Sequence, residues 1–398
     1  MAAVTSFGPA AERSGVLGKL REVDWGFCAL LAIIGAIGAL ILYSAAGNSW
    51  DPWADNHLIR FAGCFVILLV LATLNLRVWH SLAYPVYVVG VLLLVAVEVL
   101  GHTALGAQRW LKLGPLTLQP SEIVKIGLVL ALARYYQGLS AKEARWSWKL
   151  AVPAMLIGVP TVLIAHQPDL GTALLTAFTG AAIMFLAGLT WRVIVPAMVA
   201  AGVAVPVFVE FVLKEYQRNR VLTFLHPEQD PGGTGYHIMQ SKIALGSGGL
   251  LGKGYGLGTQ SALNFLPEKH TDFIFSTLAE QFGFVGSVVV LALYAAVIFS
   301  ALRTAFLSHS HFGRLCAAGV TATFSLYILI NAAMVMGLAP VVGVPMPLLS
   351  YGGTVMVTVM IGFGLVQAVR VHRYTEIVGG RTGLPWAKRK DRVEAETP

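Results

Sequence analysis

The stretch WGFCALLAIIGAIGALILYSAA, residues 25–46, contains no charged side chain. A helix needs about 20 apolar residues to cross the hydrocarbon core of a bilayer, so this stretch is long enough to span one. Nine further apolar stretches follow it along the chain. The ten predicted spans are residues 25–46, 58–74, 78–100, 121–136, 150–165, 170–189, 194–213, 273–301, 315–337 and 349–369. The sequence therefore predicts an all-α, polytopic membrane protein with about ten transmembrane helices.

The composition of the whole chain agrees with this prediction. Of its 398 residues, 56% are hydrophobic and only 12% are charged, and the mean hydropathy is +0.72. A soluble domain carries about 25% charged residues, so this chain is too poor in charge to have a water-covered surface. Cys28, Cys64 and Cys316 are scattered in or beside apolar stretches. We expect them to be small buried side chains without a disulfide or metal role.

The positions of Lys and Arg predict the orientation in the membrane. If the N-terminus is cytoplasmic, about 18 of the 28 basic residues fall on the cytoplasmic side, where positive charge is usually concentrated. We therefore predict a cytoplasmic N-terminal segment (1–24), a membrane domain (25–370) and a basic cytoplasmic tail (371–398). The first apolar run is too long for a cleavable signal peptide and is expected to be a signal anchor.

The net charge of +8 is explained by this orientation. Basic residues on the cytoplasmic side face an anionic lipid leaflet, so the charge does not indicate nucleic acid. The sequence also offers no basic helix or folded soluble module to which nucleic acid could bind. We therefore exclude nucleic acid as a partner.

One connection is much longer than the others. Residues 214–272 separate the seventh and eighth predicted spans, whereas a structureless loop rarely exceeds about 12–15 residues. The predicted orientation makes this loop extracytoplasmic. It contains a turn-rich stretch, HPEQDPGGTGY at 226–236, and a Gly-rich stretch at 246–258. Such a loop is where we expect a membrane protein to carry its chemistry.

The Gly-rich stretch does not match a nucleotide-binding loop. That motif requires a Gly five residues before its Gly-Lys pair and a Ser or Thr after the Lys, but Ser247 and Gly254 stand at these positions. We expect a tightly turned loop packed on the membrane face. The alternative that its backbone N–H groups bind a diphosphate stays open.

The stretch QPSEIVK, residues 119–125, places two opposite charges at the start of the fourth predicted span. Pro120 suits the first position of a helix, and Glu122 then lies near the positive end of the helix dipole. Lys125 follows one turn later and can pair with Glu122. Two interpretations stay open: a structural ion pair, or a polar cavity that opens toward the outer leaflet.

Two aspartates precede apolar runs and are candidate site residues. Asp169, in HQPDLGT, is expected to be the N-cap of the sixth predicted span but also lies near the outer face. Asp272 ends the stretch LPEKHTD directly before the eighth span, so it is either an N-cap or a general base at the membrane surface. The histidines show no convergent ligand spacing, and we expect no metal site built by the protein.

Four stretches together resemble a known family. Residues 106–128, 166–175, 239–280 and 337–353 are similar to the SEDS proteins, which act in shape, elongation, division and sporulation. The resemblance covers nearly the whole chain. The sequences of residues 240–254 and 258–273 are more similar to the elongation branch of the family than to the division branch. Gln281 departs from the family, which often has a second acid there, so any role for an acid at that position is in doubt.

The resemblance implies a peptidoglycan glycosyltransferase of the bacterial cytoplasmic membrane. Such an enzyme polymerises lipid II into glycan strands outside the cell and releases undecaprenyl diphosphate. The implied partners are lipid II, the nascent glycan strand, a class B penicillin-binding protein and the elongation machinery. The essential Asp of the family falls on Asp272, and its polar pair falls on Glu122 and Lys125. A division enzyme with the same chemistry, a lipid II flippase and a scaffold for the transpeptidase remain alternatives.

The implied reaction needs few groups. A sugar hydroxyl attacks the anomeric carbon of a second lipid-linked disaccharide, and the diphosphate is already a good leaving group. One base therefore suffices, in contrast to the two carboxylates of glycosidases, and Asp272 is the predicted base. Substrate contacts are predicted for Glu122, Lys125, Arg109, Lys242 and Asp169, the three cations among them lying near the diphosphate. A divalent cation such as Mg²⁺ is a possible helper, and a one-step displacement predicts inversion.

Overall fold

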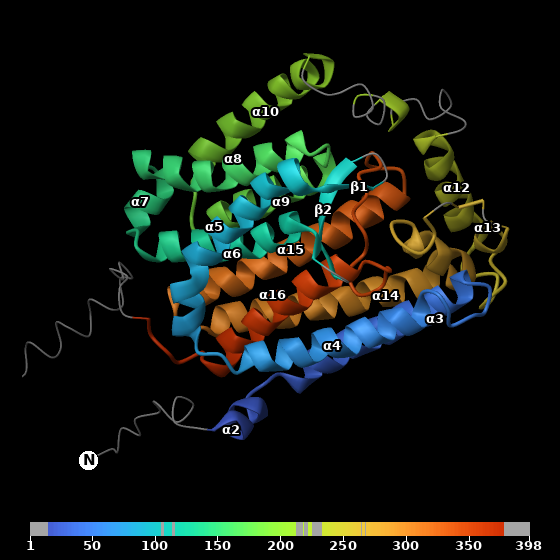
Figure 1. Cartoon of the computed structure of the whole chain (residues 1–398), viewed down its shortest axis with the longest axis horizontal. Coiled ribbons are helices and arrows are strands. Elements are labelled where there is room, and N and C mark those ends of the chain that lie inside the picture. Colours follow the sequence, from blue (N-terminus) through green and yellow to red (C-terminus); the bar gives the residue numbers. More distant parts are fainter. Residues whose placement is uncertain are drawn as a thin grey trace, which may run out of the picture.

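The computed structural model describes residues 15–104, 107–113, 116–211, 218, 222–224, 233–263, 265–266 and 268–377. Long helices packed side by side form most of the structure (Figure 1). They are α3 (Trp25–Ala45), α4 (Ala54–Ala72), α5 (Leu76–Leu100), α6 (Pro120–Gln137), α8 (Ala151–His166), α9 (Leu170–Leu186), α10 (Trp191–Phe211), α14 (Ile274–Leu307), α15 (His311–Val335) and α16 (Gly353–Val371). Each of the ten predicted spans overlaps one of these helices.

Seven helices of the described part are long and apolar enough to cross a membrane by length and composition. They are α3, α4, α5, α14, α15, α16 and the helix that joins a short 3-10 turn (η1, Trp148–Leu150) to α8. The prediction of a polytopic helical membrane protein is confirmed. The count of ten spans stays a prediction, because α9 and the apolar part of α10 (Trp191–Ala200) are shorter and α6 carries Glu122, Lys125 and Arg134.

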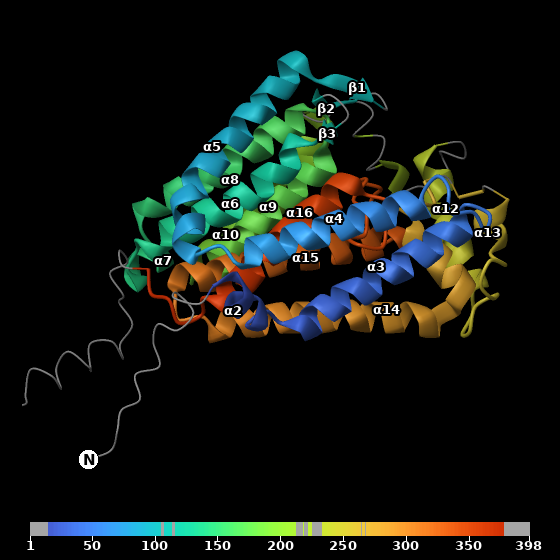
Figure 2. The ribbon, with the colours of Figure 1, turned by 60° about the horizontal axis from the view of Figure 1, so that its bottom comes forward.

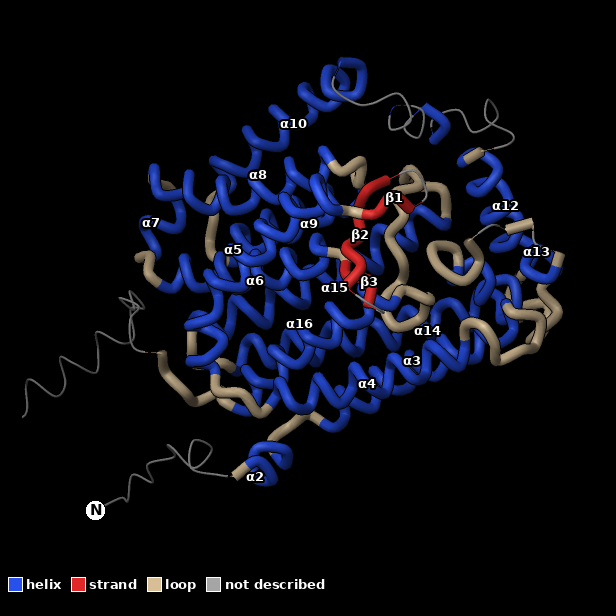
Figure 3. The backbone as a smooth tube through the Cα atoms, viewed as in Figure 1, coloured by secondary structure: helices blue, strands red, loops and turns tan. Residues whose placement is uncertain are grey.

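A small sheet, which the all-α prediction did not include, adds to the mostly helical fold. Strands β1 (His102–Ala104), β2 (Ala107–Leu113) and β3 (Leu116–Leu118) form an antiparallel sheet in the order β1-β2-β3 between α5 and α6. Hydropathy misses them because strands of three to seven residues give too few repeats of the two-residue period to stand out. Figure 3 shows the strands in red near the middle of the view, between blue helices and tan loops.

The bundle has two distinct ends. In Figures 1 and 2, α2 (Val16–Arg21) and α7 (Ala141–Arg145) lie at one end, here named the α2 end. Helices α12 (Thr234–Ser247) and α13 (Thr259–Ala262) lie at the opposite end, here named the α12 end. At the α2 end, Arg370 Nη1 lies 2.9 Å from Asp24 Oδ2 and Arg373 Nη1 lies 3.3 Å from Glu22 Oε2. The start of α3 and the end of α16 are therefore on the same side of the bundle.

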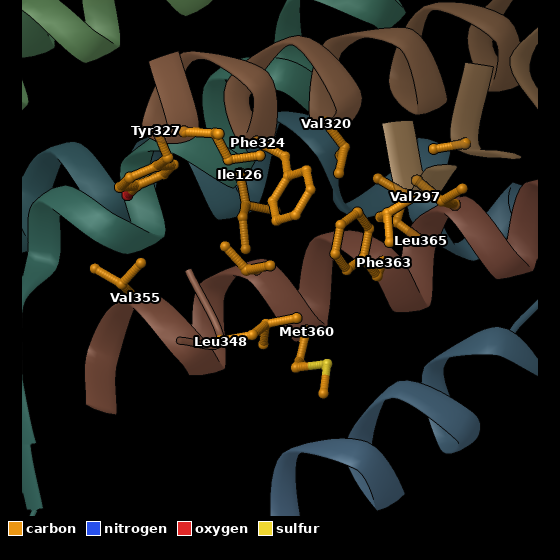
Figure 4. Close-up of a cluster of buried hydrophobic side chains, with 14 of the residues drawn as sticks. Ile126, Val297, Val320, Phe324, Tyr327, Leu348, Val355, Met360, Phe363 and Leu365 are labelled. Atoms are coloured by element: carbon orange, nitrogen blue, oxygen red, sulfur yellow. The ribbon is translucent and has the colours of Figure 1, made fainter. Parts of the chain in front are cut away.

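The core lies where α3, α6, α15 and α16 meet. The ring centroid of Phe363 is 4.8 Å from that of Phe324 and 5.0 Å from that of Phe27, with edge-on geometry in both pairs. Figure 4 shows Phe324 and Phe363 facing one another among aliphatic side chains. Such aromatic pairs contribute about 0.5–1.5 kcal/mol beyond simple burial. The central helices are therefore firmly packed supports for the polar side chains at their α12 ends.

The Gly-rich loop packs against a kink in α14. Gly283 has φ 66° and ψ −161° and interrupts the helix. At this kink the backbone N–H of Phe284 donates to the Gly249 carbonyl at 2.9 Å, and that of Lys253 donates to the Glu280 carbonyl at 3.0 Å. The expected tightly turned loop is confirmed, with α14 as the surface it packs on. The N–H groups of Lys253 and Gly254 already donate to α14, which disfavours the diphosphate alternative for these two groups.

Replacing Gly283 with alanine should lower the melting temperature of the protein in detergent by several degrees. A Cβ at this position would lie 2.3 Å from the Gly252 nitrogen, and a positive φ alone costs about 1–3 kcal/mol for a residue with a side chain. Gly63→Ala is the matched control, because a Cβ there meets nothing within 4 Å. Equal melting temperatures for the two variants would show that the kink at Gly283 does not require glycine for the stability of the fold.

Several predicted segments fall partly outside the described residues. Of the turn-rich stretch 226–236, only the part from Gly233 onward is described, and it begins α12. Within 214–272 the structure otherwise describes residues 218 and 222–224, the rest of α12, the Gly-rich loop, α13, and residues 263, 265–266 and 268–272. Residues 1–14 and 378–398 lie outside the described part, so the N-terminal segment and the basic tail stay predictions.

Candidate active site

Asp272 lies at the α12 end, one residue outside α14. The N-cap of α14 is Phe273, so the alternative that Asp272 is an N-cap is not what the structure shows. The side chain is half-buried, and its Oδ2 would lie 3.6 Å from a Cβ built on Gly343. The carboxylate therefore lies against a glycine of the segment between α15 and α16.

Asn331 of α15 holds the backbone beside Asp272. Its side chain is fully buried, and its Nδ2 donates to the carbonyl of Asp272 at 2.8 Å and to that of Val344 at 2.7 Å. One amide group thus ties the residue before α14 to the segment before α16. Sequence reasoning missed Asn331, although an amide in an apolar span was a usable signal.

The non-helical segment 337–352, here named the crossing segment, borders several predicted site residues. A Cβ on Gly337 would lie 2.8 Å from Lys242 Nζ. A Cβ on Gly171, at the start of α9, would lie 2.2 Å from the Val342 carbonyl oxygen. Gly343 meets Asp272 as described above. The crossing segment therefore brings Lys242, Asp272 and the start of α9 to one region of the α12 end.

Glu122 and Lys125 form a buried ion pair with a tyrosine. Lys125 Nζ lies 2.6 Å from Glu122 Oε1 and also donates to the hydroxyl of Tyr327. That hydroxyl donates to Glu122 Oε2 at 2.8 Å. The relative exposure is 1% for Lys125 and 4% for Glu122. Of the two interpretations left open by the sequence, the structure shows the internal ion pair, with a cavity between α6, α15 and α16 beside it.

Helix α15 connects this ion pair to Asp272. Tyr327 and Asn331 are four residues apart, so they lie on the same face of α15, about 6 Å apart along its axis. Tyr327 binds Glu122 and Lys125, whereas Asn331 binds the backbone of Asp272. The predicted pair and the predicted base are therefore attached to one rigid helix, one turn apart.

Arg109 and Asp169 meet beside the start of α6. Asp169 is the N-cap of α9, as predicted, because its Oδ1 accepts from the N–H of Thr172 at 3.1 Å. Its Oδ2 lies 3.8 Å from Arg109 Nε, which comes from β2, and 3.5 Å from Gln119 Nε2. Gln119 is the N-cap residue of α6, one turn before Glu122. The sequence-predicted Arg109 and Asp169 thus adjoin the helix that carries Glu122 and Lys125.

A second buried carboxylate, which sequence reasoning did not select, anchors the Gly-rich loop. Glu280 is fully buried and accepts from Lys253 Nζ at 2.8 Å and from the N–H of Gln260 at 3.0 Å. The next residue, Gln281, accepts from Ser44 Oγ at 2.9 Å and from the N–H of Gly256 at 3.2 Å. The neutral side-chain amide of Gln281 therefore binds this loop, at the position where the SEDS proteins that the sequence resembles often have an acid.

Aromatic side chains surround the segment just before Asp272. The ring of His270 stacks on that of Trp53, with 4.3 Å between centroids and 4° between planes. Burial lowers the pKa of His270 below its usual value, and nearby Lys269 lowers it further while Glu268 opposes the shift. His270 is therefore neutral at pH 7. In the part of the chain that the structure describes, no three His, Cys, Asp or Glu side chains converge as metal ligands.

Known proteins place this chain in a family. A family model of cell cycle proteins of the FtsW, RodA and SpoVE type matches residues 24–375. The chain belongs to this SEDS family. The expected family is confirmed, and it is the match to residues 24–375 that decides it.

Relatives with curated names favour the elongation branch of the SEDS family. The chain is 44% identical over 344 residues to the peptidoglycan glycosyltransferase MrdB of Escherichia coli K12, covering 86% of this chain and 92% of the relative. It is 38% identical to MrdB of Helicobacter pylori, covering 79% and 82%. A probable peptidoglycan glycosyltransferase FtsW of Trichlorobacter lovleyi is 34% identical, covering 87% and 93%.

Solved structures agree with the fold of this SEDS chain. A chain from a structure of a peptidoglycan synthase complex, described as coordinating polymerization and crosslinking, matches with a TM-score of 0.77 and 35% identity. The match covers 89% of this chain and 99% of that one. The crystal structure of RodA, the rod shape determining protein of Thermus thermophilus, matches with a TM-score of 0.67 and 31% identity, covering 89% and 98%.

Proposed function

We propose that this chain is a peptidoglycan glycosyltransferase that polymerises lipid II into glycan strands during cell elongation. The observation that carries the proposal is Asp272, whose backbone carbonyl is held by the buried amide of Asn331 at the α12 end, in a chain 44% identical to a named peptidoglycan glycosyltransferase. The FtsW-type division enzyme with the same chemistry is the second candidate, favoured by relatives such as the one with 34% identity.

In the proposed reaction Asp272 is the general base. Its carboxylate accepts the proton of the 4-hydroxyl of one disaccharide while that oxygen attacks the anomeric carbon of the other. The bond from the anomeric carbon to the phosphate oxygen breaks, and undecaprenyl diphosphate departs with the electron pair. The displacement inverts the anomeric carbon, and a product of retained configuration would exclude this one-step route.

The basic residues divide into two groups by exposure. Lys242 is exposed, and Arg109 keeps 26% of its side chain exposed, so both can reach a diphosphate. Lys125 is almost fully buried by Glu122 and Tyr327. We therefore propose that Arg109 and Lys242 bind the phosphates, with Asp169 orienting Arg109. Lys125 and Glu122 instead support the site through α15, which differs from the direct contact predicted from sequence.

The proposed reaction is also compatible with a divalent cation. Mg²⁺ commonly binds one or two carboxylates together with substrate phosphates and keeps several waters. Asp272, the single carboxylate proposed to meet substrate, could hold such an ion only together with the substrate diphosphate. A protein-built cage is not part of the proposal.

The orientation follows from the same site. We propose that the α12 end faces outward and the α2 end faces the cytoplasm, with both termini cytoplasmic and the active site extracytoplasmic. The basic residues of the α2 end, such as Arg370 and Arg373, support this assignment. A class B penicillin-binding protein is the proposed partner, because a matching chain comes from a complex that couples polymerization to crosslinking.

The proposed activity is tested with the purified chain, its class B partner and labelled lipid II in detergent. A gel ladder of glycan strands is the expected result. Detergent micelles have no second leaflet, so a flippase would give no ladder. A scaffold would give none either. An empty lane with active partner and intact lipid II would therefore overturn the proposed function.

Asn331→Leu should reduce the turnover of glycan polymerisation by about tenfold or more, since each unpaired buried carbonyl costs about 1–3 kcal/mol. The change keeps the shape of the side chain but removes both hydrogen bonds that hold Asp272 and Val344. We expect kcat to fall while the KM for lipid II changes little, as initial rates would show. Ser325→Ala is the control, because that hydroxyl donates only within α15, to Thr321. Equal kcat values for both variants would contradict a positioning role.

A further inference from the structure

A column of flat side chains runs across the α12 end beside Asp272. Trp53 stacks on His270, and the ring centroid of His270 lies 6.2 Å from that of Tyr351. The guanidinium of Arg60 packs on the ring of Tyr351, with 4.7 Å between Arg60 Cζ and the ring centroid. We name these four residues the Arg60 column.

Three separate segments hold the column together. Trp53 is the N-cap residue of α4 and Arg60 lies within that helix, whereas His270 precedes α14 and Tyr351 precedes α16. The N–H of Tyr351 donates to the carbonyl of His270 at 2.8 Å. A Cβ on Gly353 would lie 3.1 Å from Arg60 Nη1, so the guanidinium reaches the start of α16. The column is therefore built into the fold, two residues from Asp272.

The charge of Arg60 has no protein counter-ion among the described residues. Its side chain is exposed, and no carboxylate of the described part lies within ion-pair distance of it. It lies about 9 Å along α4 from the start of the helix. His270 is neutral at pH 7, because burial lowers its pKa. The column therefore presents one uncompensated positive charge.

An exposed arginine without a counter-ion at this position favours an anionic ligand. A cation in a membrane helix needs water or an opposite charge, and a guanidinium fits phosphate oxygens with its fork of N–H donors. A cation–π contact restrains the guanidinium without using those donors. The fork fits carboxylate and phosphate oxygens alike, and phosphates are the anions that lipid headgroups and lipid-linked substrates supply at a membrane surface.

We propose that Arg60, held by Tyr351, binds the diphosphate of a polyprenyl-linked substrate or product at the α12 end of α4. This site adds a phosphate ligand on the α4 side of Asp272, apart from Arg109 on β2 and Lys242 on α12. It rests on the proposed function for its ligand, a lipid-linked diphosphate. Trp53 and His270 support Tyr351, and through it the guanidinium, as a flat stack.

The test measures binding of labelled lipid II to the full-length chain in nanodiscs of phosphatidylcholine, alone and with competitors. Arg60→Gln should weaken binding by about tenfold, as expected for one charge-assisted contact, and Arg60→Lys should weaken it less. Tyr351→Leu should weaken binding as Arg60→Gln does, whereas Tyr351→Phe keeps the ring and should bind normally. Arg303→Gln is the control, because it removes an exposed arginine near the α2 end of α14.

The competitors identify the source of the phosphate. Undecaprenyl diphosphate should displace lipid II from the wild type and much less from Arg60→Gln, whereas phosphatidylglycerol should displace little from either. Unchanged affinity in a folded Arg60→Gln protein, or equal displacement by phosphatidylglycerol, would overturn the proposal. Binding is measured without turnover, so Arg60-dependent binding by a wild type that makes no glycan would contradict only the proposed function.

Discussion

Replacing Lys125 with methionine should destabilise the protein by about 3–5 kcal/mol, the usual cost of leaving one member of a buried ion pair alone. Lys125 and Glu122 are almost fully buried, and their charged atoms are 2.6 Å apart. Without the ammonium group, the carboxylate of Glu122 keeps, among the described residues, only the hydroxyl of Tyr327 as a donor. The measurement is equilibrium unfolding in detergent, monitored by the circular-dichroism signal of the helices.

A double variant separates the ion pair from the volume of the side chain. Glu122→Gln together with Lys125→Met removes both charges and nearly preserves the packing, so most of the lost stability should return. Buried ion pairs are often replaced by neutral groups without loss. If the double variant were as unstable as Lys125→Met alone, the defect would come from packing in the neighbouring cavity and not from an unpaired charge.

Hydropathy alone predicted most of the fold. Each apolar stretch overlaps a helix because lipid leaves the backbone little choice but to satisfy its hydrogen bonds within a segment. Asp169 was predicted as an N-cap from local sequence, and it caps α9. The sheet of β1, β2 and β3 was missed, since its pairing depends on contacts between short strands that leave no mark in a hydropathy profile.

The candidate site was predictable only in part. Glu122 and Lys125 are three residues apart, so their pairing follows from helix geometry, and the place of Asp272 before α14 was visible as a charge beside an apolar run. Tyr327 binds Glu122 across 205 residues of sequence, and Asn331 binds Asp272 across 59. Such contacts depend on which helices become neighbours, which one sequence read alone does not reveal.

Replacing Asp272 with asparagine should reduce glycan polymerisation by about 10²–10⁴-fold, the usual contribution of general-base catalysis. The amide has nearly the shape of the carboxylate but cannot accept the proton of the attacking hydroxyl. The contact of Asn331 with Asp272 uses the backbone carbonyl, so it survives the substitution. Lipid II binding and the melting temperature should therefore stay close to those of the wild type.

Glu268→Gln is the matched control for Asp272→Asn. It removes a carboxylate from the same turn before α14, where Glu268 is exposed and accepts from the hydroxyl of Thr271 at 2.8 Å. Its loss should leave polymerisation within about threefold of the wild type, as expected for a surface substitution that changes stability by under about 0.5 kcal/mol. A large loss in this variant would indicate that general negative charge, and not the base at Asp272, supports the reaction.

The central claim is tested most directly by the initial rate of glycan formation from labelled lipid II, measured for three purified complexes with the class B partner. Wild type and Glu268→Gln should both give ladders of long glycan strands, and Asp272→Asn should give unreacted lipid II that still binds to the protein. A ladder from Asp272→Asn equal to that of the wild type would contradict the assignment of Asp272 as the base of this enzyme.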